Sequence, residues 1–186
     1  MEYGIKRLKD LPISIRLICE IHKILMEGVR GENMTAGEIR RSQNWIGRPG
    51  CTLNEATYVP PPVEEMKRAL NDWETYLHSK SDEPPLIQCA LIHYQFEAIH
   101  PFLDGNGRIG RLLITFFLRE RGHLTQPLLY LSVFFERYRE EYYSRLLAVS
   151  QKGDWQGWIK FFLRGVAYQA KDAVEDAKKV LALHKE

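Results

Sequence analysis

Apolar residues recur every three or four positions through most of this 186-residue chain, and that spacing constrains its fold more than any other feature. The period matches one face of an α-helix. It predicts helices over these ranges: 13–28, 63–78, 86–99, 108–121, 136–149, 154–169 and 171–184. The run Leu112–Leu118 is apolar almost all round, which is typical of a helix buried on every side. We therefore expect an all-α bundle with a single core.

One segment departs from the helical pattern. Residues 43–62 carry glycines, prolines and β-forming residues on both sides of a short polar turn. They predict a hairpin in which Cys51–Leu53 pairs with Ala56–Val59, within an excursion over about residues 51–60. No composition shift marks a domain boundary, so we expect one domain over 1–186 with its core at about 10–180.

Charge and cysteine content exclude several classes of protein. Lys and Arg number 26 against 24 Asp and Glu, a net charge of +2 with no basic block, which gives no support for nucleic-acid binding. Three widely spaced cysteines, Cys19, Cys51 and Cys89, suit reduced thiols in a cytoplasmic protein. No targeting segment is visible, and no apolar run approaches the ~20 residues of a membrane span.

The segment richest in chemistry is HPFLDGNGRIGR, residues 100–111, between two apolar helices. Pro101 disfavours helical geometry at His100, so the preceding helix should end with that imidazole at the mouth of a loop. Asp104 is followed by Gly-Asn-Gly, which favours a turn whose N–H groups point into one concavity. The next helix begins at about Arg108, so its positive N-terminal end should face the same point.

Arg108 and Arg111 are three residues apart and share a helix face. Together with the turn, the helix N-terminus and the carboxylate, they describe a site for a polyphosphate and a metal ion. Taken singly, each part has a plainer interpretation: His100 as a helix C-cap, Asp104 as a turn residue. No Gly-Lys-[Ser/Thr] follows, as a Walker A loop requires, and no ligand set for zinc is complete.

The same twelve residues resemble the signature of the Fic (filamentation induced by cAMP) family, H-x-F-x-[D/E]-G-N-G-R-x-x-R, and match it at every defined position. The stretches RRSQNWIG and ATYVPPP resemble the family's flap region, and LLYLSVFFERYREEYY resembles one of its later helices. The resemblance implies a Fic-type helical bundle with a short β-hairpin flap. It also implies a protein adenylyltransferase, which transfers AMP from ATP to a Ser, Thr or Tyr hydroxyl of a target protein.

The resemblance also assigns roles. His100 would be the general base, with a pKa near 7, and Asp104 would hold Mg²⁺ against the phosphates. The side chain of Asn106 would contact the α-phosphate, and Arg108 and Arg111 would neutralise the outer phosphates. The residues expected to bind ATP phosphates are Gly105, Asn106, Gly107, Arg108, Gly110 and Arg111.

Two further groups of residues follow from the resemblance. Ala56, Thr57, Tyr58 and Val59 would form the flap, which lies near the nucleotide and pairs with an extended segment of the target. The alternative is a purely structural hairpin. Tyr142, Tyr143 and Ser150 would line the adenine pocket, although one of the two tyrosines could equally belong to the core.

Gly107 bears on the type of reaction, because related Doc-type kinases carry Lys there and transfer the terminal phosphate instead. A glycine favours transfer of AMP. Removal of AMP from modified targets, transfer of another phosphate-linked group at the same site, and a non-catalytic nucleotide-binding domain stay open as alternatives.

Many relatives carry an inhibitory pattern, [S/T]-x-x-x-E-[G/N], whose glutamate pairs with the second arginine. The nearest match here, Ser132 to Glu136, is followed by Arg137 and so departs from the pattern. We therefore expect Arg111 to be free, with either a trimmed core or a separate inhibitory partner. Apolar residues of the terminal helices leave a homodimer open as a further partner.

Overall fold

The structure is a computed structural model that describes residues 1–27, 35–125 and 129–183. Its helices are α1 (Glu2–Arg7), α2 (Ile15–Met26), α3 (Val63–His78), α4 (Pro85–Ile99), α5 (Asn106–Glu120), α6 (Leu131–Arg137), α7 (Arg139–Lys152) and α8 (Trp155–Leu183), with one short 3-10 turn, η1 (Leu53–Glu55). The expected all-α bundle is confirmed. Within the described ranges, no helix combines the length and the apolar character needed to cross a membrane.

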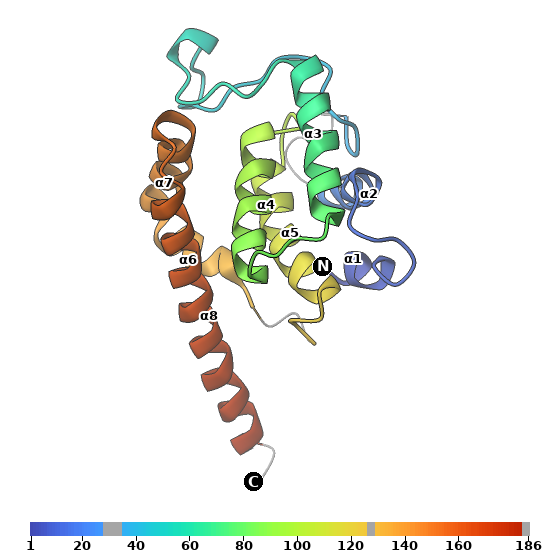
Figure 1. Ribbon diagram of the computed structural model, residues 1–186, viewed down its shortest axis with the longest axis vertical. Coiled ribbons are helices and arrows are strands. Elements are labelled where there is room, and N and C mark those ends of the chain that lie inside the picture. Colours follow the sequence, from blue (N-terminus) through green and yellow to red (C-terminus); the bar gives the residue numbers. More distant parts are fainter. Residues whose placement is uncertain (28–34, 126–128, 184–186) are drawn as a thin grey trace.

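Helices α4 and α5 form the centre of the bundle (Figure 1). Helix α4 packs against α3, α5, α7 and α8, which explains why its apolar residues cover most of its circumference. In α5 the predicted run Leu112–Leu118 is buried from Leu113 onward, and Leu112 is half-buried. The two central helices are joined by residues 100–105, so the motif loop lies at one end of the core.

Local signals account for the ends of several helices. The Ser14 hydroxyl accepts the Leu17 N–H at 3.3 Å and caps α2. Pro85 occupies the first turn of α4, where a missing N–H costs nothing. Helix α5 begins at Asn106, two residues earlier than expected, because Gly105 takes the left-handed conformation (φ +80°) and starts the helix directly.

The C-terminal helices differ from the sequence-based prediction. The expected helix over 136–149 is two helices, which meet at Tyr138, and the expected pair over 154–169 and 171–184 is the single helix α8. No glycine or proline marks the break at Tyr138. Its ring packs 4.7 Å from that of Phe134, with the Arg164 guanidinium 5.1 Å from its centre, so tertiary packing places the break.

The predicted hairpin is wrong in its pairing. Among the described residues, the only β-contact is a single antiparallel bridge between Ile46 and Tyr58, with Ile46 N–H bonded to the Tyr58 carbonyl at 2.9 Å. Cys51–Leu53 does not pair with Ala56–Val59, because Thr52 and Glu55 form a capping box that folds the intervening residues into η1. In Figure 1 this cyan segment extends over one end of the bundle, above α4 and α7. We call residues 43–60 the flap.

Candidate active site

His100 ends helix α4 in the left-handed conformation, with φ +50°. Its Nδ1 lies 3.2 Å from the Glu97 carbonyl oxygen, so Nδ1 carries the proton and donates it to that oxygen. The other ring nitrogen, Nε2, is then an acceptor in the neutral ring. Burial lowers the pKa of His100 to about 4, below the value near 7 that a general base suggests, and the nearby Arg40 lowers it further. The imidazole is therefore neutral at physiological pH.

A buried arginine from a distant part of the chain holds His100 in place. The Arg40 side chain is only 1% exposed, and its Nε donates to the His100 carbonyl oxygen at 3.0 Å. Its other nitrogens donate to the carbonyl oxygens of Ser42 and Pro61, and its main-chain N–H donates to that of Pro101 at 2.9 Å. Arg40 thus joins the motif loop to both ends of the flap.

The loop from Asp104 to Asn106 is also internally bonded. Asp104 Oδ1 accepts the Gly105 N–H at 2.6 Å. Asn106 is buried, and its side chain both accepts the Phe102 N–H at 2.9 Å and donates to the Phe102 carbonyl oxygen at 2.8 Å. In this structure the Asn106 amide therefore braces the loop, and its contact with an α-phosphate stays a prediction.

The N-terminal end of α5 has the character expected of an anion site. The first bond within this helix runs from the Ile109 N–H to the Gly105 carbonyl oxygen at 3.0 Å. The N–H groups of Asn106, Gly107 and Arg108 precede it and have no acceptor within the helix. Free N–H groups and the helix dipole together favour a negative ligand at this point.

His22 supports the loop from helix α2, and no sequence pattern identifies it. Its ring stacks on Phe102 with centroids 3.9 Å apart. Its Nδ1 accepts the Gly37 N–H at 2.8 Å, so Nε2 carries the proton and donates to the Asp104 carbonyl oxygen at 2.9 Å. The position of Asp104 is therefore fixed by a residue 82 positions earlier.

The two motif arginines turn in different directions. Arg108 pairs with Asp104 at 3.3 Å and contacts the Met26 sulfur, also at 3.3 Å, so it faces helix α2. Arg111 instead lines a hollow against α6 and α7, and it forms no ion pair with any carboxylate in the described parts of the chain. Three-residue spacing places both residues on nearby faces, but tertiary packing separates their guanidiniums.

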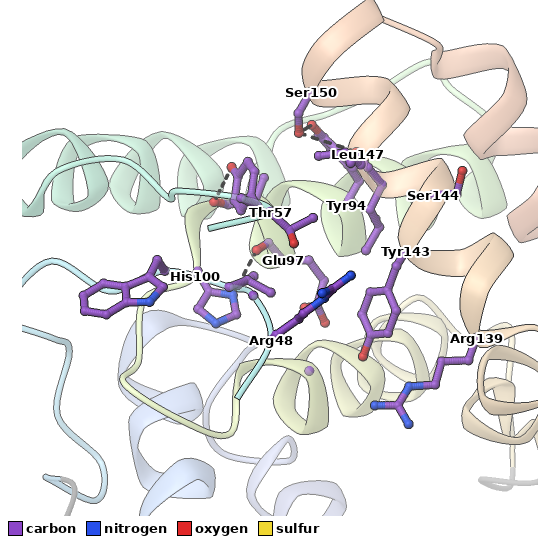
Figure 2. Close-up of a pocket in the computed structure, with 17 residues that line it drawn as sticks. Arg48, Thr57, Tyr94, Glu97, His100, Arg139, Tyr143, Ser144, Leu147 and Ser150 are labelled. Atoms are coloured by element: carbon purple, nitrogen blue, oxygen red, sulfur yellow. Dashed lines mark hydrogen bonds between the residues drawn. The ribbon is translucent and has the colours of Figure 1, made fainter. Parts of the chain in front are cut away.

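A cavity of about 690 Å³ lies beside His100 (Figure 2). Among the predicted site residues it is lined by Thr57, Tyr58, His100, Gly107, Tyr143 and Ser150. The other predicted site residues do not line it: Ala56, Val59, Asp104, Gly105, Asn106, Arg108, Gly110, Arg111 and Tyr142. The cavity thus brings together the flap, the end of α4, the start of α5 and helix α7, and its size is typical of a small-molecule site.

Only one of the two adjacent tyrosines belongs to this cavity. Tyr142 is buried, stacks on Phe135 at 4.6 Å, and its hydroxyl lies 3.0 Å from His93 Nε2. Tyr142 therefore packs with the aromatic core and borders the hollow that Arg111 lines, and its place in an adenine pocket stays a prediction. Tyr143 is half exposed and faces the cavity. Ser150 also lines the cavity, and its hydroxyl lies 2.9 Å from the Tyr94 hydroxyl.

Several residues that line the cavity have no signature in the sequence: Trp45, Arg48, Tyr94, Glu97, Arg139, Ser144 and Leu147. Glu97 is the most unusual of them, because its Oε1 is buried and has no hydrogen-bond partner among the described residues. Burial raises its pKa to about 7, against the opposing effect of Arg111. A side chain at Gly110 would collide with it, since a Cβ there would lie 2.2 Å from Glu97 Oε1.

Asp104 is the residue that suits a divalent cation. Its carboxylate is half exposed at the mouth of the loop, and no cluster of three potential metal ligands occurs in the described ranges. A single carboxylate fits Mg²⁺, which typically keeps several waters and completes its shell with substrate phosphates. One half-exposed carboxylate therefore fits a hydrated magnesium ion.

Comparison with known proteins identifies the family of this chain. The Fic/DOC family profile matches residues 12–118, and the chain belongs to that family. The protein adenylyltransferase Fic of Aedes aegypti is 32% identical over 151 residues, which cover 80% of this chain and 27% of the mosquito protein. The chain therefore spans little more than a quarter of this curated relative.

Solved structures of the family share the fold. A Fic family protein from Desulfovibrio desulfuricans G20 is 26% identical with a TM-score of 0.76, over 95% of this chain and 52% of that one. Fic-1 from C. elegans is 25% identical with a TM-score of 0.71, over 96% of this chain and 50% of that one. The match in each case extends well beyond the motif loop.

Proposed function

We propose that this protein transfers AMP from ATP to a hydroxyl side chain of a target protein and releases pyrophosphate. One observation carries the proposal: His100, neutral with an acceptor nitrogen, and Gly107, whose N–H has no acceptor within α5, line one cavity. A base beside an anion site suits attack of a hydroxyl on a phosphate. The relatives named protein adenylyltransferase support the choice of AMP.

In the proposed reaction the target hydroxyl oxygen forms a bond to the α-phosphorus of ATP. The bond from that phosphorus to the bridging oxygen breaks, and its electron pair leaves with pyrophosphate. The hydroxyl proton moves to His100 Nε2. Because the Nδ1 proton is held by the Glu97 carbonyl oxygen, the ring keeps the tautomer that this step requires.

The chain's own groups would stabilise the charge that develops. The free main-chain N–H groups of Asn106, Gly107 and Arg108 would bind the phosphates, and Arg111 would neutralise the leaving pyrophosphate. Asp104 would hold Mg²⁺, which supplies further neutralisation of the phosphates when it is bound. Gly107 faces the cavity, and a Cβ there would lie 3.1 Å from an Arg111 nitrogen, so a larger residue would compete with the phosphates for this space.

The flap would position the target, and the rest of the cavity would hold the adenine of ATP. Thr57 and Tyr58 line the cavity from the flap side, while the Tyr58 hydroxyl donates to the Ala98 carbonyl oxygen at 2.9 Å and anchors the flap to α4. Tyr143 offers an aromatic face for adenine, close to Leu147 and Ser150. An extended target segment would pair with the main chain beside Tyr58. A separate inhibitory protein, or a second copy of this chain, would be a further partner.

The test uses two labelled forms of ATP with Mg²⁺ and a cell lysate as the source of targets. Label in the α-phosphate should appear on protein, and label in the γ-phosphate should not. The reverse result would identify a kinase. His100→Ala should remove the α-label while ATP binding stays within a few-fold of wild type, since the base is not needed for binding. Loss of label from a pre-modified target would instead identify removal of AMP, and ATP binding without any transfer would identify a nucleotide-binding domain.

A further inference from the structure

The cavity that holds His100 adjoins a second, smaller hollow. The smaller one has a volume of about 250 Å³ and is lined by Arg111, Ser132, Phe135, Glu136, Arg139, Tyr142 and Tyr143. Arg139 and Tyr143 also line the larger cavity, so the two hollows meet at these two side chains. In Figure 2 Arg139 leaves α7 beside Tyr143, at the end of the cavity away from Ser150.

The smaller hollow is short of negative charge. It holds two guanidiniums, those of Arg111 and Arg139, and one carboxylate, that of Glu136. The pair between Glu136 and Arg139 is 3.5 Å long, and the two side chains are 74% and 63% exposed. An exposed pair of this kind is worth little, so a more highly charged ligand can replace the carboxylate.

Arg108, the residue that the motif spacing favours, does not reach either hollow. Its guanidinium is occupied by Asp104 and by the Met26 sulfur on the α2 side of the loop. A nucleotide whose first phosphate lies at Gly107 would extend its outer phosphates past Arg111 and Arg139 into the smaller hollow. Its adenine would then lie in the larger cavity, on the side of the Tyr143 ring that faces Leu147 and Ser150.

We propose that Arg139 binds the outer phosphates of the nucleotide together with Arg111, in the role that the motif alone gives to Arg108. Arg139 is then a specificity residue, which makes this protein prefer a nucleoside triphosphate to a nucleoside monophosphate. The inference rests on the proposed function for the orientation of the nucleotide. It adds that a residue of α7, outside the motif, recognises the leaving group.

Binding measurements by calorimetry with ATP and with AMP test the proposal in the whole chain, without any transfer reaction. Arg139→Ala should weaken ATP binding about tenfold or more, since it removes charge-assisted bonds, and change AMP binding less than about twofold. Arg139→Lys should recover part of the loss, because it keeps the charge but not the fork geometry. Arg16→Ala, an exposed cation of α2, is the matched control and should leave both affinities unchanged.

Three results would overturn the proposal. An equal loss of ATP and AMP binding in Arg139→Ala would mean that Arg139 acts on the adenine, through the Tyr143 ring whose centre lies 5.8 Å from its guanidinium. Selective loss of ATP binding in Arg108→Ala, with Arg139→Ala unchanged, would return the role to the motif residue. Equal affinity of the wild type for ATP and AMP would show that no outer phosphates are bound. A protein that prefers ATP through Arg139 but transfers no AMP would refute only the proposed function.

Discussion

The motif loop and the flap line the same cavity but are held in opposite ways. Residues 100–106 are fixed from within and from behind, by the Asn106 amide, the His22 ring and the Arg40 guanidinium. The flap has one β-bridge and exposes large apolar residues, with Trp45 at 42%, Leu53 at 43% and Val59 at 47%. This difference suits the proposed function, in which a general base and a phosphate site need fixed geometry and the flap receives a target segment on uncovered apolar groups.

The strongest challenge to this comparison is removal of Arg40, which joins the two regions. Arg40→Met keeps much of the stem but leaves the carbonyl oxygens of His100, Ser42 and Pro61 without their donor. We expect a loss of about 3 kcal/mol in the free energy of unfolding by urea, since buried groups lose their partners. Arg41→Met, next in the chain with an 86% exposed side chain, is the control and should change stability by less than about 0.5 kcal/mol. An equal loss of stability in Arg40→Met and Arg41→Met would mean that Arg40 does not hold the motif loop and the flap together.

A smaller but more local effect is expected at the motif loop itself. Asn106→Ala removes both side-chain bonds to Phe102 and leaves the buried Phe102 N–H without an acceptor. We expect the free energy of unfolding to fall by about 2 kcal/mol. Asn54→Ala makes the same chemical change at an exposed position of the flap, and it should lower the free energy of unfolding by less than about 0.5 kcal/mol. Urea unfolding of both variants measures the contrast. A costly Asn54→Ala would show that the flap is held as firmly as the loop.

Glu97 gives a pH-dependent test of how tightly the loop side of the cavity is buried. Its folded-state pKa of about 7 lies above the ordinary 4.5, so the folded protein binds the proton more tightly than the unfolded chain does. Stability from this group is therefore lost as pH rises from about 4.5 to 7. Glu97→Gln, which copies the protonated form, should raise the melting temperature by a few degrees at pH 8 and by little at pH 4.5.

The control for this pH test is Glu65→Gln, an exposed glutamate of α3, which should give the same small change at both pH values. If Glu97→Gln changes the melting temperature by the same amount at both pH values, the Glu97 carboxyl is not held neutral by burial.

The smallest effect is expected within the flap. Glu55→Ala removes the capping box that closes η1, in which Glu55 accepts from both the N–H and the hydroxyl of Thr52. Amide hydrogen exchange at Thr52 should accelerate several-fold, while the melting temperature stays within about 1 °C. A large fall in melting temperature would show that the flap unfolds only together with the core, and would break the comparison.

How much of this could be predicted from sequence differs between the two regions. Helical periodicity predicts α3 to the residue and Pro101 predicts the end of α4, because these signals act within a few residues, whereas α5 begins two residues before its predicted start. The flap pairing is not predicted, since Ile46 and Tyr58 bond across a loop whose shape depends on the Thr52–Glu55 capping box. That box follows a recognisable pattern, Thr-x-x-Glu, which a search for capping motifs would find.

The side chains of the site divide in the same way. The twelve motif residues indicate a phosphate site and a base because their order dictates a turn, a helix N-terminus and an imidazole side by side. Arg139 and Tyr143 line the cavity while Arg108 and Tyr142 do not, and this depends on how helices α2, α6 and α7 pack around α5. Spacing along one helix fixes only an approximate direction for a long side chain, and its neighbours decide the rest.

The sequence by itself determined the class of fold and the chemistry of the loop, because both rest on local backbone preferences and on the period of apolar residues. Only the tertiary structure decided that Arg40 and His22 hold that loop, that Glu97 Oε1 is buried with no hydrogen-bond partner among the described residues, and that Arg139 lies between two hollows. Each of these depends on residues far apart in the chain that meet when the core forms, and no spacing within one segment encodes such a meeting.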